Sequence, residues 1–510
     1  MLARVATSIV IGIEAVPITV EVDVSSGGLP GLTMVGLPDA TVRESRERVR
    51  TAIRNAGFPF PGTRVTVSLA PADVRKIGVA FDLPIAVGIL AASGALPHHE
   101  PPPLVIVGGV SLDGGVTPMR GLLPIAAATR ALGAGLMFPD ENFREASIVD
   151  GLPLFPVRSL AEAARVLVHP SPRPAVAPTR LPRADRDGTE DLADVRGQQA
   201  GRRALEIAAA GAHHLLMSGP PGAGKTMLAR RLPGLLPPLR FDEALTVTTI
   251  HSVAGVLPSD AGLLTERPFR APHHTCSQIA LIGGGAIPRP GELSLAHHGV
   301  LFLDELPEFT RHTLETLRQP LELRQVHIAR AARTATFPAA AMLVAAMNPC
   351  PCGLAGDPHR QCRCDAGSVE RYRRRLSAPL LDRFDLRLDI PSVPWADLEN
   401  AQLEAEPSLA VRARVIAARD RQWTRQGRLN ADLAGADLRA LCAPDTLDAR
   451  AVLRRAVERW HLSVRGVGRV LRVARTIADL GGSGGVTADH LAEALQFRRP
   501  DGDPAAYENG

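Results

Sequence analysis

The stretch HLLMSGPPGAGKTMLARRL, residues 214–232, decides the fold of this 510-residue chain. The apolar run His214–Ser218 leads directly into a glycine-rich turn, and the helix-like run Met227–Arg231 follows. Strand, glycine turn and helix in this order are the context of a phosphate-binding loop, whose backbone N–H groups face the phosphates of a nucleotide. The sequence therefore predicts an ATP site formed by Gly219, Pro220, Pro221, Gly222, Ala223, Gly224, Lys225 and Thr226.

Two side chains of this loop have distinct tasks. The Lys225 ammonium is expected to reach the β- and γ-phosphates, and the Thr226 hydroxyl is expected to hold Mg²⁺. Composition points to the same lysine, because nearly all basic residues are arginines and the only lysines are Lys76 and Lys225. A guanidinium cannot replace a compact ammonium at such a site. Lys76 is expected to be a solvated lysine rather than an anion-binding one.

Two further apolar runs end in polar side chains. Val300–Asp304 is followed by Glu305, so two carboxylates stand at the end of a strand. We expect Asp304 to hold Mg²⁺, directly or through water, and Glu305 to orient or deprotonate the attacking water. Met342–Met347 is followed by Asn348, whose amide can position that water. The alternation of strands and helices predicts a parallel α/β sheet.

The segment LLDRFD at 380–385 places Arg383 between apolar neighbours and two aspartates. Two interpretations stay open. Arg383 could be an arginine finger, which stabilises transition-state charge at the site of a neighbouring subunit. It could instead form a structural ion pair with Asp382 or Asp385.

The remaining regions differ in pattern. Strand-like runs (Ile18–Val24, Arg64–Leu69) and an amphipathic run (Ala40–Ala56) precede a Pro- and Arg-rich stretch without periodicity. Helical runs such as Ala410–Arg425 and Arg465–Leu480 dominate the C-terminal part. We expect an N-terminal domain over 1–165, a linker over 166–190, an ATPase core over 191–395, a helical domain over 396–499 and a disordered tail over 500–510.

Composition bounds the class of protein. Hydrophobic residues make up 45% and charged residues 22%, as in ordinary soluble globular proteins. No apolar run is long enough to span a bilayer, and Glu14 and Glu21 interrupt the N-terminal run, which excludes the layout of a signal peptide. We therefore expect a cytoplasmic protein without a membrane partner. The net charge of +5 permits nucleic-acid binding without demanding it.

Four of the six cysteines are crowded into Cys350, Cys352, Cys362 and Cys364. Two close thiol pairs on a short hairpin could place four sulfurs around Zn²⁺, as an insertion over 350–364. The C-x-C spacing is tighter than the commoner C-x-x-C, and four free buried thiols are the alternative. A disulfide framework is not expected in a cytoplasmic protein.

Several long motifs resemble the AAA+ ATPases of the magnesium-chelatase-like branch, and most closely the ComM/YifB family. The resemblance covers nearly the whole chain. The motifs that carry it lie at Gly28–Arg50, Lys76–Leu90, Arg267–Gly285, Arg289–Phe309, Asn348–Gly353 and Leu380–Leu386.

This resemblance implies roles for single residues. It implies that Asn348 is sensor 1, which contacts the γ-phosphate, and that Arg383 is the arginine finger that acts on the site of a neighbouring subunit. Ser463 fits a helix cap that would aim Arg465, the candidate second sensor, at the phosphates. A finger in trans needs a head-to-tail interface, which closes as a ring, and the family implies a homohexamer.

The resemblance also implies a Lon-protease-like (ribosomal S5 domain 2-like) α+β fold for residues 1–165. Lon-type proteases use a Ser–Lys dyad, but the matching positions here hold Ala80 and Leu123. Neither residue can act as nucleophile or base. We therefore expect an inactive module for binding or assembly rather than a peptidase.

The substrate is the least determined property. Arg330 and Arg333 on a hairpin-like insertion, with Arg373 and Arg374 in the run 371–375, could follow a phosphate backbone, or they could belong to a solvated basic face. The resemblance implies a DNA helicase that drives branch migration in natural transformation, acting on single-stranded or branched DNA. The alternative is a chelatase-type ATPase that remodels a protein partner during metal insertion. We expect the N-terminal domain to favour the first, because chelatase motor subunits typically lack it.

Overall fold

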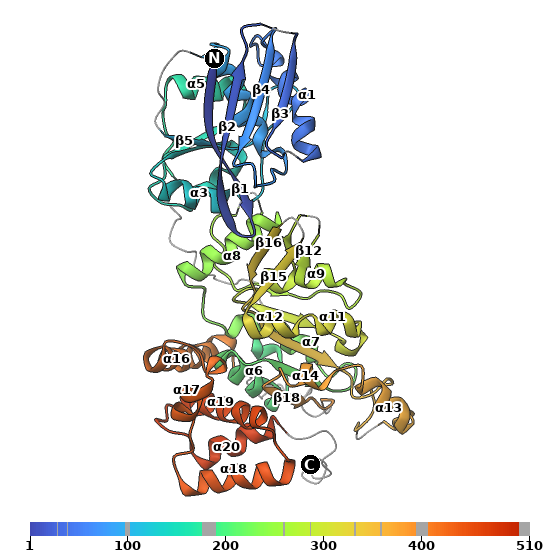
Figure 1. The fold of residues 1–510 in the computed structure, drawn as a ribbon. Helices are drawn as coiled ribbons and strands as arrows, with labels where there is room; N and C mark the ends of the chain where they lie inside the picture. Colours follow the sequence, from blue (N-terminus) through green and yellow to red (C-terminus); the bar gives the residue numbers. More distant parts are fainter. Residues whose placement is uncertain are drawn as a thin grey trace.

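The computed structural model of the protein describes residues 1–27, 29–37, 39–96, 103–175, 190–258, 261–285, 287–330, 333–357, 360–393 and 406–498, without the side chains of residues 40, 330 and 333. Three parts follow one another along the molecule: an N-terminal sheet, a central nucleotide-binding core and a C-terminal group of helices (Figure 1). Most of the expected linker and all of the expected tail lie outside the described residues.

The N-terminal part contains a seven-stranded mixed sheet. A long hairpin pairs β1 with β2 in antiparallel register, β4 joins β2 antiparallel, and the other pairs are parallel. The strands in spatial order are β3 (Gly31–Val35), β4 (Arg64–Ala70), β2 (Glu14–Val24), β1 (Leu2–Ile11), β5 (Leu104–Ile106), β8 (Gly135–Pro139) and β9 (Leu154–Val157). The helices are α1 (Ala40–Asn55), α2 (Asp82–Ala92), α3 (Leu122–Ala131), α4 (Phe143–Ala146) and α5 (Leu160–Val168), and β6 (Gly109–Val110) pairs with β7 (Val116–Thr117).

Alternation explains these strands. In β2, Ile18, Val20 and Val22 are buried while the residues between them face the other side of the sheet. The predicted strands Ile18–Val24 and Arg64–Leu69 are confirmed within β2 and β4. The solvated state expected for Lys76 is wrong: its side chain is fully buried, and its ammonium donates to the backbone carbonyl of Pro71. That hydrogen bond offsets part of the cost of burying the charge.

The central sheet has five strands, all paired in parallel, in the order β11–β14–β17–β10–β18. Both faces are covered: Val300 and Phe302 of β14 enter one apolar core, while Leu301 and Leu303 enter the other. The predicted strand Met342–Met347 is confirmed with the same bounds. The strands are β10 (Leu215–Ser218), β11 (Phe269–Arg270), β14 (Val300–Leu303), β17 (Met342–Met347) and β18 (Leu386–Asp389).

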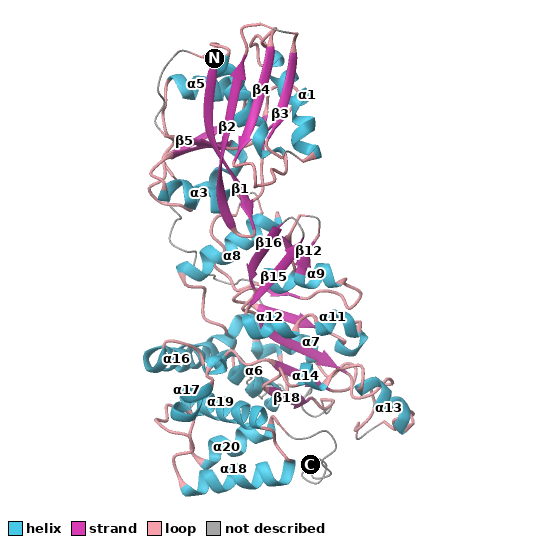
Figure 2. Ribbon diagram, in the orientation of Figure 1, coloured by secondary structure: helices cyan, strands magenta, loops and turns pink. Residues whose placement is uncertain are grey.

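Helices pack around this sheet, and two short hairpins, which follow β11 and β14 in the chain, lie between the sheet and the N-terminal part (Figure 2). The helices are α6 (Gln199–Gly211), α7 (Lys225–Leu235), α8 (Phe241–Ala254), α9 (Gln278–Ile282), α10 (Glu292–Leu295), α11 (Arg311–Glu315), α12 (Arg318–Leu323), α13 (Ala366–Arg373) and α14 (Ala378–Leu381). The hairpins are β12 (Gly283–Gly284) with β13 (Arg289–Pro290), and β15 (Gln325–Arg330) with β16 (Arg333–Pro338).

The N-terminal part contacts the core at the β15–β16 hairpin and at α8. At the turn between β1 and β2, a side chain on Gly12 would lie 3.1 Å from the Thr336 carbonyl oxygen in β16. Ser252 of α8 donates to the Glu145 carboxylate, which also accepts the Leu123 backbone N–H at 2.8 Å. Burial raises the pKa of Glu145, and these hydrogen bonds oppose that rise. Backbone contacts and buried hydrogen bonds thus join the two parts.

The C-terminal part is helical, and its apolar side chains join the core on one face of the central sheet. Arg419 donates from its Nη2 to the Ala209 carbonyl oxygen at 2.6 Å, and Gln422 donates to that of Ala210 at 3.1 Å. These carbonyls end α6 and would otherwise lack partners. The helices are α16 (Ser408–Gln426), α17 (Gly435–Leu441), α18 (Leu447–Trp460), α19 (Val464–Leu480) and α20 (Ala488–Gln496). Among the helices in the described ranges, none combines the length and the apolar character needed to cross a bilayer.

Asp385 ties the helices to the core. Its buried carboxylate lies 3.4 Å from His213 Nδ1, 3.5 Å from Arg469 Nε and 3.6 Å from Arg472 Nη2. Burial alone would raise the pKa of Asp385, but the hydrogen bond from His213 and the charges of His213 and Arg472 outweigh it, so the pKa is held well below its usual range. The resulting stabilisation is present above the ordinary carboxyl pKa of about 4 and is lost as the pH falls.

We expect Asp385→Asn to lower the free energy of unfolding by about 3 kcal/mol, because it leaves buried guanidinium groups without their carboxylate. Urea unfolding followed by tryptophan fluorescence would measure the change, since Trp423 and Trp460 lie in α16 and α18. The control is Glu370→Gln, which breaks an exposed pair with Arg374 and should cost less than about 1 kcal/mol. Equal unfolding midpoints for the two variants would contradict this role of Asp385.

Candidate nucleotide site

The glycine-rich loop begins where β10 ends and stops where α7 begins at Lys225. Gly222 and Gly224 have φ angles of 80° and 88°, in the left-handed region that favours glycine. A side chain at Gly219 would lie 2.2 Å from the Ile390 carbonyl oxygen, because β18 runs beside β10. The loop therefore depends on glycine for both its conformation and its packing.

Lys225 lies at the centre of the site. Its ammonium donates to the carbonyl oxygens of Gly219 and Pro220 at 2.7 and 2.9 Å. It also donates to the Asn348 side-chain oxygen at 3.2 Å. Burial lowers the pKa of Lys225, and the charge of Asp304 opposes that effect. The lysine of the loop and the polar residue after β17 are thus in direct contact.

The carboxylates that follow β14 lie beside the loop. Thr226 Oγ1 donates to Asp304 Oδ2 at 2.7 Å, and the Glu305 backbone N–H donates to Asp304 Oδ1 at 2.9 Å. The φ angle of Glu305 is 51°, an uncommon conformation for a residue with a side chain. Such conformations persist where the surrounding structure fixes them, and they cluster at functional sites.

A pocket of ≈ 250 Å³ opens beside these groups. It is lined by Thr226, Arg230, Ala271, Pro272, His273, His274, Phe302, Asp304 and Glu305. Its polar groups are two carboxylates, a hydroxyl, a guanidinium and two imidazoles. Carboxylate and hydroxyl oxygens are ligands for Mg²⁺, and the N–H groups of the loop and the Lys225 ammonium suit phosphate oxygens. The arrangement is suited to a magnesium-bound nucleoside triphosphate.

His274 is a site residue that the sequence analysis did not single out. Its Nδ1 lies 3.2 Å from Glu305 Oε2, and its ring is in edge contact with Phe309. The paired histidines of the stretch APHHT, residues 271–275, were the available signal. The partner of His274, Glu305, lies far along the chain on another strand end, which no local pattern reveals.

Arg383 and Arg465 lie around a different carboxylate. Arg383 Nη2 donates to Glu322 Oε2 at 2.7 Å, whereas the neighbouring Asp382 accepts from Arg469 and Arg498. Arg383 lowers the pKa of Glu322 by its hydrogen bond and its charge, and the charge of Arg465 adds to this effect. Ser463 caps α19 as expected, by accepting the Gly466 N–H at 3.1 Å. Arg465 is exposed.

The candidate DNA contacts fall into two separate places. The β15–β16 hairpin closes with the pair Arg330 and Arg333 and lies next to the N-terminal part, while α13 projects from the far side of the core (Figure 1). Arg373 and Arg374 are exposed at the end of α13, where Arg374 donates to Glu370 at 2.5 Å. The side chains of Arg330 and Arg333 lie outside the described part of the structure.

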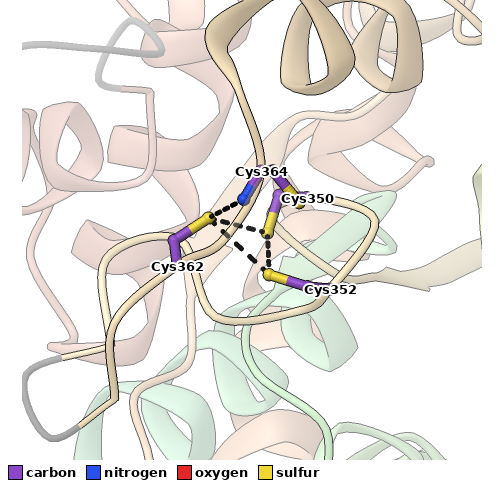
Figure 3. Close-up of side chains that lie close together, drawn as sticks. All are labelled: Cys350, Cys352, Cys362 and Cys364. Atoms are coloured by element: carbon purple, nitrogen blue, oxygen red, sulfur yellow. Dashed lines mark hydrogen bonds between the residues drawn. The ribbon is translucent and has the colours of Figure 1, made fainter.

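The four cysteines of the segment 350–364 converge (Figure 3). The sulfur of Cys350 lies 3.4 Å from that of Cys352 and 3.7 Å from that of Cys362, and Cys352 and Cys362 are 3.6 Å apart. The sulfurs of all four lie within 4.8 Å of one another. Cys276 and Cys442 lie apart from this cluster as free thiols.

Comparison with known proteins gives matches along most of the chain. Residues 191–398 match the family model described as "Magnesium chelatase, subunit ChlI", residues 20–142 match "Subunit ChlI of Mg-chelatase", and residues 405–498 match "Magnesium chelatase, subunit ChlI C-terminal". The chain is 46% identical over 504 residues to the uncharacterized protein YifB of Salmonella typhimurium, covering 98% of this chain and 97% of that protein. It is 43% identical over 502 residues to the competence protein ComM of Haemophilus influenzae, with the same coverage of 98% and 97%.

Two weaker similarities cover parts of the chain. Lon protease 2 of Bacillus subtilis is 30% identical over 161 residues, 29% of this chain and 28% of that protein. The probable DNA helicase MCM9 of Arabidopsis thaliana is 25% identical over 212 residues, 42% of this chain and 27% of that protein.

Residues 191–398, which contain the glycine-rich loop and the five-stranded parallel sheet, match the magnesium chelatase model, so the chain is of the magnesium-chelatase-like AAA+ class. Within that class, the identities of 46% to YifB and 43% to ComM extend over nearly the full length of the chain and indicate one family. The chain belongs to the YifB and ComM family.

We expect Lys225→Ala to lower the rate of ATP hydrolysis by about 100-fold or more while the fold stays intact, because the polar contacts that its ammonium makes with described residues all lie within the site. Lys225→Arg should lose as much, since a planar guanidinium does not fit around the same oxygens. Phosphate release at saturating ATP and circular dichroism would measure the two properties. Thr226→Ser, which keeps the hydroxyl, is the control and should retain activity, whereas an active Lys225→Ala variant would contradict the site.

Proposed function

We propose that the protein is an ATP-hydrolysing ring motor, a homohexamer that translocates on single-stranded or branched DNA in natural transformation and recombination. The observation that carries this proposal is the meeting of Lys225, Thr226 and Asp304 beside Glu305 and Asn348. In this proposal the working parts are an N-terminal module over 1–165, a linker over 166–190, an ATPase core over 191–395 and a helical lid over 396–499, in the cytoplasm.

The chain supplies each group that ATP hydrolysis needs. Lys225 and the loop N–H groups bind the phosphates, while Thr226 and Asp304 hold Mg²⁺, which supplies charge neutralisation to the phosphate oxygens. Glu305 takes the proton of the attacking water, and Asn348 positions that water. His274, 3.2 Å from the Glu305 carboxylate, orients it. Catalysis then consists of positioning and electrostatic stabilisation.

Arg383 and Arg465 are proposed to act on the ATP of the neighbouring subunit. Arg383 forms its ion pair within the chain with Glu322, whereas the expected partner Asp385 pairs with Arg469. Arg465 shares the surroundings of Glu322, so we assign both arginines to one interface surface. Because such an interface joins unlike faces, it closes as a ring.

DNA as the substrate is supported by relatives and by charge. ComM is named a competence protein, and the weaker relative MCM9 is named a probable DNA helicase. Arg330 and Arg333 on the hairpin, and Arg373 and Arg374 on α13, are the proposed contacts with the phosphate backbone. Aromatic residues make up only 4% of the chain, so binding rests on the backbone rather than on stacking of bases.

The alternative is a chelatase-type ATPase that remodels a protein partner during metal insertion. The N-terminal domain does not separate the two functions as expected, because residues 20–142 match a model that is itself described by a chelatase subunit. Identity over nearly the whole length of ComM favours DNA. The assay with DNA below decides between them.

The N-terminal part is proposed to be a Lon-protease-like fold without peptidase activity. A relative named Lon protease 2 matches 29% of the chain, a share comparable in length to this part. Ala80 and the buried Leu123 stand where the dyad is expected, and neither side chain has a reactive group. We therefore propose that this part is a module for binding a partner or for assembling the oligomer. A structural Zn²⁺ at the four cysteines is the second metal of the proposal.

We expect single-stranded DNA to stimulate ATP hydrolysis, and ATP to drive strand displacement on a three-way junction. Arg373→Ala combined with Arg374→Ala should weaken DNA binding at every sequence, because these contacts are electrostatic, and added salt should weaken it further. Fluorescence anisotropy with labelled oligonucleotides would measure the affinity. The matched control replaces both arginines by lysine and keeps the charge. Without stimulation or unwinding, the DNA function is overturned.

We expect Arg383→Ala to lower the hydrolysis rate by about 1000-fold without loss of ATP binding, as for an arginine finger. Lys225→Ala chains are inactive for a different reason, so mixed rings of the two variants should regain activity. In such rings an intact loop meets an intact Arg383 from the next subunit. A mixture as inactive as its components would show that Arg383 does not act in trans.

A further inference from the structure

The cysteine sulfurs have the spacing of a tetrahedral metal site. Four thiolates at the usual Zn–S distance of about 2.3 Å lie about 3.8 Å from one another. The measured separations of 3.4, 3.6 and 3.7 Å among Cys350, Cys352 and Cys362 are close to that value, and Cys364 completes the group (Figure 3). Four sulfur ligands in a tetrahedral arrangement suit zinc or iron rather than Mg²⁺, Ca²⁺ or Mn²⁺, and zinc is the usual ion of a structural Cys₄ site.

Backbone groups around the sulfurs fit the same chemistry. The Ala355 N–H donates to the sulfur of Cys350 at 3.3 Å, and the Cys364 N–H donates to that of Cys362 at 3.4 Å. Hydrogen bonds to ligand atoms orient them and stabilise their charge. The loop therefore supplies both the ligands and the donors behind them.

Few buried side chains stabilise the cysteine-containing loop, residues 350–364. Among its described residues, 350–357 and 360–364, only Cys350 and Gly353 are buried. A loop with so small an apolar core needs a cross-link, as small metal-bound domains do.

This loop nevertheless packs on the nucleotide site. A side chain added at Gly353 would lie 2.5 Å from Pro221 of the phosphate-binding loop. Cys350 follows Asn348 after one residue, and Cys364 is followed by Asp365, which caps α13 by accepting the Ser368 N–H at 2.8 Å. One side of the cysteine loop thus touches Pro221, and its two ends lead to Asn348 and α13.

We propose that Cys350, Cys352, Cys362 and Cys364 bind Zn²⁺, and that the ion holds this loop as a clamp on the phosphate-binding loop and Asn348. The inference rests on the proposed ATP site at Lys225. Removing the ion releases Gly353 from Pro221, so nucleotide binding weakens even though no ligand of the metal touches the nucleotide.

The first experiment measures zinc in the full-length chain, purified without a metal-affinity tag. Elemental analysis should find about one zinc per chain, and Cys352→Ser and Cys364→Ser should lose it. Cys276→Ser, which removes a cysteine outside the cluster, is the matched control and should retain it. A wild-type chain without zinc, or zinc that survives both cluster substitutions, would overturn the site.

The second experiment separates the clamp from metal binding. Gly353→Ala keeps the four ligands but pushes against Pro221, so zinc should stay while the Kd for a fluorescent ATP analogue rises about tenfold or more. Gly356→Ala is the matched control, because Gly356 has the same φ of 79° in the same loop. Chelation should weaken binding of the analogue to the wild-type chain, and added Zn²⁺ should restore it.

Unchanged binding of the analogue, both in Gly353→Ala and in the chelated wild-type chain, would overturn the clamp. These measurements use no DNA. A chain that binds the analogue but does not respond to DNA therefore fails as a DNA motor and still tests the clamp. A chain that does not bind the analogue at all fails as an ATPase, while its zinc content is still measurable.

Discussion

The parallel pairing of β10 with β17 and β18 is the constraint on which the site depends. Ser218 stands opposite Met347 on one side and Asp389 on the other, so the chain leaves neighbouring strands at one edge of the sheet. Strand β14 joins from the far side of β17, with Leu303 opposite Ala345. The phosphate-binding loop, Asn348 and the two carboxylates consequently meet, as expected at the carboxyl ends of parallel strands.

The site itself is polar, strained and only partly buried. Packing in the two apolar cores offsets the free energy that the site costs. A left-handed Glu305 and a Lys225 ammonium withdrawn from water each cost free energy. Alternate residues of β14 and β17 enter cores on opposite faces of the sheet, so each strand is held from both sides. Rigid strands are what keep the ends of the loops in register.

Elements with a local signal could be predicted from the sequence. The apolar run Met342–Met347 and the glycine-rich turn before Lys225 are set by neighbouring residues, so periodicity and spacing were sufficient. The missed features depend on residues far apart in the chain. The contact of Gly353 with Pro221 joins segments that no pattern connects. Arg383 finds its partner in Glu322 for the same reason. Lys76 is the exception, because the carbonyl that accepts its hydrogen bond lies only five residues away, at Pro71, and hydrophobic periodicity does not predict the burial of its ammonium.

The shared core between the central sheet and the C-terminal helices has a mechanical consequence. Side chains of α16 and α19, such as Val415 and Val473, lie in the same apolar cluster as Leu215 and Val344 of the sheet. Swinging these helices away from the sheet would break close packing, which yields in discrete steps and resists gradual deformation. Sheet and helices therefore behave as one stiff body. Polar surfaces outside this packed body, such as the one around Glu322 and Arg383, lack such close apolar packing and can change partners at a lower cost.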